Sequence, residues 1–267
     1  MSSVLGRGEK IMGLFKRKQV IPFESYFLHT PVHKNTPEHA VRWAVLDLEA
    51  TGFDVHSDRI LSVAVAIVEN GQFHMDSCQS WLVYQSQNCV NEATKIHGIL
   101  PSQTEGGIPE EQMLETLIPL LQGTILVGHH VGFDIAMLDV ALKKHFSIAL
   151  KNQVLDTALF ASKELDAFQR TGYSNQPLPT MEDVCFQLNI PMAERHTAEG
   201  DVFTNVQMFL ILRGRLKMRL QRELTLSDYP LIEAKRVLRF GKHVWKVGGL
   251  GEKIEQFLQV LSLPSHR

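Results

Sequence analysis

Residues 43–50 read WAVLDLEA and residues 59–75 read RILSVAVAIVENGQFHM. Both stretches are rich in apolar and β-branched side chains, which favours strands. The second stretch is divided by Asn70-Gly71, a pair that is typical of a two-residue hairpin turn. A third strand is predicted over Ser80–Tyr84. The pattern therefore predicts neighbouring antiparallel strands that open a mixed sheet.

Beyond these strands the pattern alternates between helices and one further strand. Pro109 suits the start of a helix, and the following residues, EEQMLETLIPLL, have helical spacing. TILVGHH (124–130) is predicted as a short buried strand, and residues 166–179 as a surface loop. The other predicted helices cover residues 133–146, 157–165, 180–188 and 198–217. The fold class is therefore α/β, a sheet with helices packed on it.

Composition limits the class of protein. Of 267 residues, 44% are hydrophobic and 21% are charged, which is typical of a globular protein, and no apolar run is long enough to cross a bilayer. The N-terminus lacks the order of a secretory signal, so the cytoplasm is the expected location. Three cysteines without metal-ligand spacing predict neither a disulfide framework nor a zinc site.

Two acids lie on the first predicted strand. Asp47 and Glu49 are two residues apart, so both side chains project from the same face. Such a pair is costly to bury without a cation, and Mg²⁺ or Mn²⁺ prefers oxygen ligands. Asp134 begins the helix after the strand at 124–130, where open α/β sheets place ligands. Taken singly, the acid pair is equally well explained as a structural or surface feature, and Asp134 is better explained as a helix-capping aspartate.

The segment HTAEGDV adds two more candidate residues. His196 lies five residues before Asp201, and a helix is predicted to begin between them. A histidine just before a helix and an aspartate in its early turns can face one cleft. Histidine is also the side-chain type whose ordinary pKa lies near neutral pH. A lone histidine would more simply be a packing residue.

Together these residues resemble the DEDDh exonucleases, a family that includes the proofreading subunit of bacterial replicative polymerases and ribonuclease T. The resemblance covers about residues 42–215, and order and spacing agree throughout. The matching motifs are DLEATG at 47–52, KIHGI at 95–99, VGHHVGFD at 127–134, LDT at 155–157, TMEDVCFQLNI at 180–190 and RHTAEGD at 195–201. The resemblance implies a ribonuclease H-like mixed sheet flanked by helices.

The resemblance also implies roles for the matched residues. The four acids Asp47, Glu49, Asp134 and Asp201 would bind two divalent cations, Mg²⁺ or Mn²⁺, and His196 would act as general base. Two such ions roughly 4 Å apart activate a water, neutralise the attacked phosphate and stabilise the leaving oxygen.

The same resemblance points to substrate contacts. Leu48, Thr51 and His97 would hold the terminal nucleotide, with Leu48 acting through its backbone. His97 could equally be a structural residue. Where the family commonly has Asn four residues before the second-motif Asp, this chain has His130. A substrate contact is therefore expected to differ at His130.

Outside the matched region the chain is basic. Residues 42–212 carry nine Lys/Arg and 21 Asp/Glu, whereas the two ends are net positive. The predicted organisation is a basic N-terminal arm (1–41), an exonuclease domain (42–215) and a helical basic C-terminal extension (216–267). The extension carries two helix-like stretches, at about 231–240 and 252–261. Within the arm, QVIPF at 19–23 weakly resembles peptides that dock on sliding clamps, and a packed arm is the alternative. The basic stretch RGRLKMRLQR (213–222) is either a phosphate-binding surface or a solvated helix end.

The function predicted from the resemblance is 3′-to-5′ removal of nucleotides from single-stranded or frayed DNA, alone or with a polymerase. An exoribonuclease that trims RNA ends is the alternative within the same chemistry, since the catalytic residues do not read the sugar. An inactive nucleic-acid-binding scaffold of the same fold is the alternative from another class. All five functional positions are filled, which argues against the scaffold.

Overall fold

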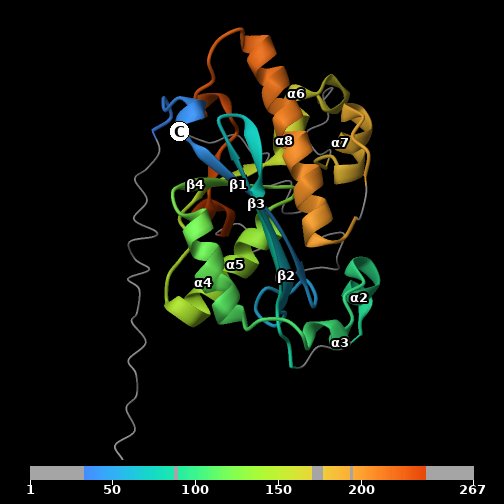
Figure 1. Ribbon diagram of the computed structural model, residues 1–267. Coiled ribbons are helices and arrows are strands. Elements are labelled where there is room, and N and C mark those ends of the chain that lie inside the picture. The colour runs from blue at the N-terminus through green and yellow to red at the C-terminus, as the bar shows by residue number, and fades with distance from the viewer. Residues whose placement is uncertain (1–32, 87–89, 170–176, 193–194, 239–267) are drawn as a thin grey trace, which may run out of the picture.

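The computed structural model describes residues 33–86, 90–169, 177–192 and 195–238. Within these ranges one sheet has the strand order β3-β2-β1-β4-β5-β6, and helices cover both of its faces (Figure 1). The strands are β1 Arg42–Ala50, β2 Ile60–Glu69, β3 Gln72–Leu82, β4 Thr124–Gly128, β5 Gln153–Asp156 and β6 Ile232–Glu233. The α-helices are α2 Glu92–His97, α3 Pro101–Thr104, α4 Glu110–Leu121, α5 Gly132–Phe146, α6 Thr157–Glu164, α7 Met181–Leu188 and α8 Ala198–Leu220. The α/β fold class predicted from the sequence is confirmed.

Strand β1 lies inside the sheet, antiparallel to β2 and parallel to β4. The predicted hairpin turn between β2 and β3 is present. Asn70 has a φ of 53° and Gly71 a φ of 69°, the left-handed pair that a type I′ turn requires. The mixed sheet therefore opens with the antiparallel strands that the sequence predicts.

The prediction of a separate strand over Ser80–Tyr84 is wrong, because β3 continues from the hairpin to Leu82. Between His74 and Gln79, β3 has four residues where β2 has only Ala66. The Ser77 hydroxyl fills this bulge by accepting the Ile67 N–H at 2.9 Å and donating to the His74 carbonyl. The extra residues break the alternation of side chains between the two faces of β3. The sequence of this one strand therefore resembles that of two separate strands.

The side chains of β1 alternate between two cores. Leu46 and Leu48 pack on the face that α4 and α5 cover. Trp43 and Val45 pack on the opposite face, under α6 to α8 (Figure 1). Trp43 is fully buried there, with its ring centroid 4.9 Å from that of Phe209 on α8. This alternation places the next odd-numbered side chains of β1 beneath α8.

The helices predicted over residues 133–146, 157–165, 180–188 and 198–217 are present as α5 to α8, and the starts of α7 and α8 follow local capping. Thr180 and Asp183 form a reciprocal capping box at the start of α7. At the start of α8 the Thr197 hydroxyl accepts the Gly200 N–H at 3.1 Å. No helix in the described ranges is long and apolar enough to span a membrane.

Segments on both sides of the matched region pack on the core. Glu38 is buried and forms an ion pair of 2.7 Å with Arg213 on α8. The helix predicted over residues 231–240 begins only at Ala234, because Ile232 pairs with Val154 at the open edge of β5. The clamp-like stretch 19–23 and the helix-like stretch 252–261 lie outside the described residues. The boundaries at 41 and 215 stay a prediction.

The basic stretch 213–222 is largely paired with carboxylates. Besides Arg213, three of its cations form ion pairs with acids on neighbouring segments. These pairs are Lys217–Glu223, Arg219–Glu164 and Arg222–Asp228, at 2.9, 2.7 and 2.6 Å. Four of its five cations are thus engaged within the part of the chain that the structure describes. These contacts favour a role in packing over a role in phosphate binding for this stretch.

Candidate active site

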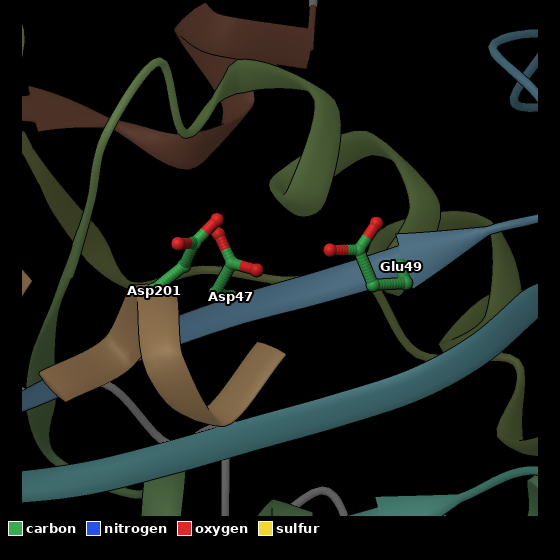
Figure 2. Close-up of side chains that lie close together, drawn as sticks. All are labelled: Asp47, Glu49 and Asp201. Atoms are coloured by element: carbon green, nitrogen blue, oxygen red, sulfur yellow. The ribbon is translucent and has the colours of Figure 1, made fainter. Parts of the chain in front are cut away.

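The site begins on β1, where two acids continue the alternation of the strand. Leu46 and Leu48 point into the core beneath α4 and α5, so Asp47 and Glu49 project from the opposite face. Both side chains rise from the strand toward the start of α8 (Figure 2).

Asp201 comes from the first turn of α8 and meets the two acids of β1 (Figure 2). One carboxylate oxygen from each of Asp47, Glu49 and Asp201 lies within 4.8 Å of the other two. Thr197 caps the helix just before Asp201, which fixes where this first turn begins. Residues more than 150 positions apart thus form one cluster of oxygen ligands.

The fourth acid, Asp134, reaches the site from the first turn of α5. It lines the same cavity as the other three, which has a volume of about 230 Å³. Its Oδ1 accepts the backbone N–H of Leu48 at 3.1 Å, which ties α5 to β1 beside Asp47. Asp134 therefore lies next to the group of three, held in place by the strand itself.

Burial makes this cluster electrostatically unfavourable. It raises the pKa of Asp47 well above the usual range, and the neighbouring acids, Asp134 first, raise it further. Burial and then the charge of Asp201 raise the pKa of Glu49 to about 8, and burial raises the pKa of Asp134 to about 8. Such crowding of acids is what a bound cation relieves, and an all-oxygen donor set fits Mg²⁺ or Mn²⁺.

His196 lines the same cavity and directly precedes the cap of α8. Its backbone has a φ of 63°, a left-handed conformation that is uncommon for a residue other than glycine. The surrounding structure must hold such a conformation, and residues of this kind gather at functional sites. The structure thus brings all five of the strongest sequence candidates to one cavity.

The predicted substrate contacts divide into two groups. Leu48, His97 and His130 are among the residues that line the cavity. Nδ1 of His97 accepts the Ile99 N–H at 3.0 Å, so part of this ring also serves the turn after α2.

Thr51 is not brought to the cavity. Its hydroxyl donates to Asp58 at 2.8 Å and accepts the Arg59 N–H at 3.0 Å. These bonds close the turn between β1 and β2. The Thr51 hydroxyl is therefore engaged in this turn and not with the four candidate metal ligands. The family pattern matches Thr51 by position in the sequence, which does not reveal these partners.

Two residues that sequence reasoning missed complete the site. Arg195 forms an ion pair with Asp201, the one such pair that the four acids make within the described ranges. Asp156, at the end of β5, is buried and accepts hydrogen bonds from the backbone N–H groups of His130, Val131 and Ala158. Arg195 lies in RHTAEGD and Asp156 lies in LDT, two motifs that match the family. Their place in these motifs was the sequence signal that could have identified both residues.

Asp156 therefore shapes the turn that leads from β4 to Asp134. Asp156→Ala would leave buried N–H groups without acceptors, so we expect the free energy of unfolding to fall by at least about 3 kcal/mol. Urea unfolding measures this, with the exposed Asp166→Ala as control, expected within about 0.5 kcal/mol of the wild type. A loss below about 1 kcal/mol for Asp156→Ala would contradict this role.

Apolar side chains form another part of the cavity wall. Phe53, Ile96 and Phe133 line it beside the acids, and the rings of Phe53 and Phe133 lie 5.9 Å apart. A cavity lined by both acids and aromatic rings can hold a group that carries charge as well as a flat apolar face.

Comparison with known proteins relates this site to nucleases. The chain is 25% identical over 199 residues to the PolC-type DNA polymerase III of Thermotoga maritima, covering 72% of this chain and 14% of that protein. It is 25% identical over 203 residues to the 3′-5′ exonuclease DinG of Bacillus subtilis, covering 76% of this chain and 20% of that protein. The chain thus corresponds to a small part of each of these longer relatives.

The fold has solved counterparts as well. Exonuclease I of E. coli, in complex with a dT13 oligonucleotide, superimposes with a TM-score of 0.55 at 15% identity, over 68% of this chain and 42% of that chain. A family model described as exonuclease, of the ribonuclease T type, matches residues 44–209, the segment that holds all four acids and His196. The chain therefore belongs to this exonuclease family.

Proposed function

We propose that this protein is a metal-dependent 3′-to-5′ exonuclease that releases nucleoside monophosphates from single-stranded or frayed DNA ends. The observation that supports this most strongly is the convergence of Asp47, Glu49 and Asp201, whose oxygens lie within 4.8 Å of one another. Asp134 and His196 line the same cavity. The direction of attack is that named for DinG, a relative of this chain.

The proposed ligands of two divalent cations are Asp47, Glu49, Asp134 and Asp201. The fit rests on the donor set, which is all oxygen, and on burial that raises the pKa of Asp47, Glu49 and Asp134. Bound Mg²⁺ or Mn²⁺ would lower the pKa of a water and neutralise charge on the scissile phosphate.

The remaining residues have roles in the reaction that follow from their place in the cavity. We assign to His196 the removal of the proton from the attacking water through a ring nitrogen. Phe53, Ile96 and Phe133 would pack against the terminal nucleoside, because a base offers a flat apolar face. Leu48, His97 and His130 are proposed as further substrate contacts.

DNA is the preferred substrate in this proposal. The relatives include a DNA polymerase of the PolC type, and the structural neighbour exonuclease I was crystallised with a dT13 oligonucleotide. A polymerase is a proposed protein partner, because relatives of this chain are DNA polymerase III proteins. A sliding clamp is a proposed partner through the sequence QVIPF at 19–23. Action on RNA would require contacts to the 2′-hydroxyl.

The direct test is a product ladder from 5′-labelled DNA and RNA of the same sequence, with Mg²⁺, with Mn²⁺ and with chelator. We expect the DNA to shorten one nucleotide at a time from the 3′ end only when a metal is present. Faster shortening of RNA would make the protein an exoribonuclease. Binding of the oligonucleotides without release of nucleotides, with either metal, would make it a scaffold and end the proposal.

The acids also predict a pH dependence of the metal-free protein. Glu49 and Asp134 have a pKa of about 8 when folded, against 4.5 and 3.8 ordinarily, so the folded state binds more protons than the unfolded chain between these limits. The stability of the metal-free protein is therefore expected to fall as the pH rises from about 5 to about 8.

Metal should reverse this trend, because only the deprotonated carboxylates bind it. We expect Mn²⁺ to raise the melting temperature more at pH 8 than at pH 6, measured by thermal unfolding with and without chelator. A metal-free melting temperature that stays constant or rises between pH 5 and pH 8 would contradict the raised pKa values.

A further inference from the structure

Arg195 joins the acid cluster to a carboxylate outside it. Its Nε and Nη2 donate to Oε1 of Glu182 at 3.0 and 2.7 Å, and its Nη1 donates to Oδ1 of Asp201. Glu182 lies in the first turn of α7, so this one guanidinium bridges α7 and α8. The side chain of Arg195 is 21% exposed, whereas that of Glu182 is 49% exposed.

This arginine is the counter-charge of the cluster in the absence of metal. Its charge lowers the pKa of both Asp47 and Glu49, opposing the effect of burial. It also occupies an oxygen of Asp201, one of the three acids whose oxygens come within 4.8 Å. A divalent cation that binds these acids therefore meets Arg195 at the same carboxylate, and repulsion between the two positive charges favours release of Arg195 from Asp201.

The ion pair with Glu182 determines where Arg195 lies once it has been displaced from Asp201. Two of its nitrogens are held by Glu182, which lies outside the cluster, so the side chain would stay at the site after losing Asp201. Nη1, which donates to Asp201 in the metal-free protein, would then be a free donor beside the cavity that Asp201 lines. Guanidinium groups are suited to phosphate oxygens, since their planar donors match that geometry.

We propose that Arg195 exchanges Asp201 for a phosphate of the bound strand when metal enters the site. Arg195 thus acts as a temporary counter-ion in the empty protein and as a phosphate-binding residue in the loaded one. This inference rests on the proposed nuclease function. It adds that occupation of the metal site prepares the site for a polyanionic substrate.

The exchange is tested by measuring metal binding and substrate binding separately. Arg195→Gln removes both the competitor for Asp201 and a nearby positive charge, so we expect Mn²⁺ to bind about tenfold more tightly in calorimetry without oligonucleotide. At saturating Mn²⁺ the KM for a short single-stranded DNA should rise about tenfold, because a phosphate contact is lost. Arg195→Met, also uncharged and of similar length, serves if the first variant is poorly folded.

The matched control is Arg219→Gln, which removes an arginine from the other end of α8. Arg219 likewise donates Nε and Nη2 to one glutamate, Glu164, at 3.2 and 2.7 Å. Arg219→Gln should change neither the affinity for Mn²⁺ nor the KM for single-stranded DNA. If removal of Arg195 leaves either constant unchanged or weakens metal binding, the exchange is overturned. A wild type that binds no Mn²⁺ at all would instead overturn the proposed function itself.

Discussion

Replacing Asp47 with asparagine is expected to lower kcat by about 1000-fold, equivalent to about 4 kcal/mol of transition-state stabilisation. The side chain keeps its shape but loses the charge that would bind the metal. Asp47 lies at the centre of the cluster, and all of the other three acids raise its pKa. Mononucleotide release from labelled DNA with saturating Mg²⁺ measures the loss. Comparable losses are expected for Glu49→Ala, Asp134→Ala and Asp201→Ala.

The same variant is expected to be more stable than the wild type when metal is removed. At pH 8, charging the buried Asp47 beside other acids opposes folding, and asparagine removes that cost. Thermal unfolding in chelator therefore separates loss of a ligand from loss of the fold. The control is Asp76→Asn, at an exposed position of β3, which should alter neither property. Wild-type cleavage by Asp47→Asn would remove this residue from the metal site.

Replacing His196 is expected to lower kcat by about 10² to 10⁴-fold, the usual contribution of a general base. The loss can be incomplete, because hydroxide from bulk water can replace the base. His196→Asn is the cleaner variant, since asparagine tolerates the left-handed backbone at this position better than alanine does. His196→Ala should show a similar loss with some added instability.

The pH profile at saturating metal tests the role of His196 as base. We expect the rate of the wild type to rise across neutral pH and that of His196→Asn to lack this rise. The exposed His74 on β3 provides a control substitution, His74→Asn, that should retain the wild-type profile. If the His196 variant keeps both the rate and the profile of the wild type, another group must take the proton.

The strongest sequence predictions concern residues whose position depends on local periodicity. The two-residue alternation of β1 places Asp47 and Glu49 on one face, and the cap at Thr197 places Asp201 in the first turn of α8. The position of Asp134 is likewise predicted by the local sequence, because Asp134 lies at the start of the helix that comes after a buried strand. These local rules, with the family resemblance, were sufficient to predict which side chains meet.

What the sequence did not predict depends on partners that are distant along the chain. Arg195 matters because of Glu182, and Asp156 because of a turn 25 residues earlier. Ile232 lies in a stretch with a helix-like sequence yet joins the sheet, since β5 offers it a strand to pair with. In each case a tertiary hydrogen bond determines the outcome, and no local pattern encodes it.

The bulge in β3 has a consequence for how copies of this protein behave in solution. β3 is the outermost strand on its side of the sheet, and a long regular outer strand is a template on which another chain can add. Residues 75–78 interrupt the row of backbone N–H and C=O groups along β3. At the opposite edge of the sheet, β6 spans only Ile232–Glu233. Within the described residues both borders are therefore poor templates, so we expect strand addition between copies to be disfavoured.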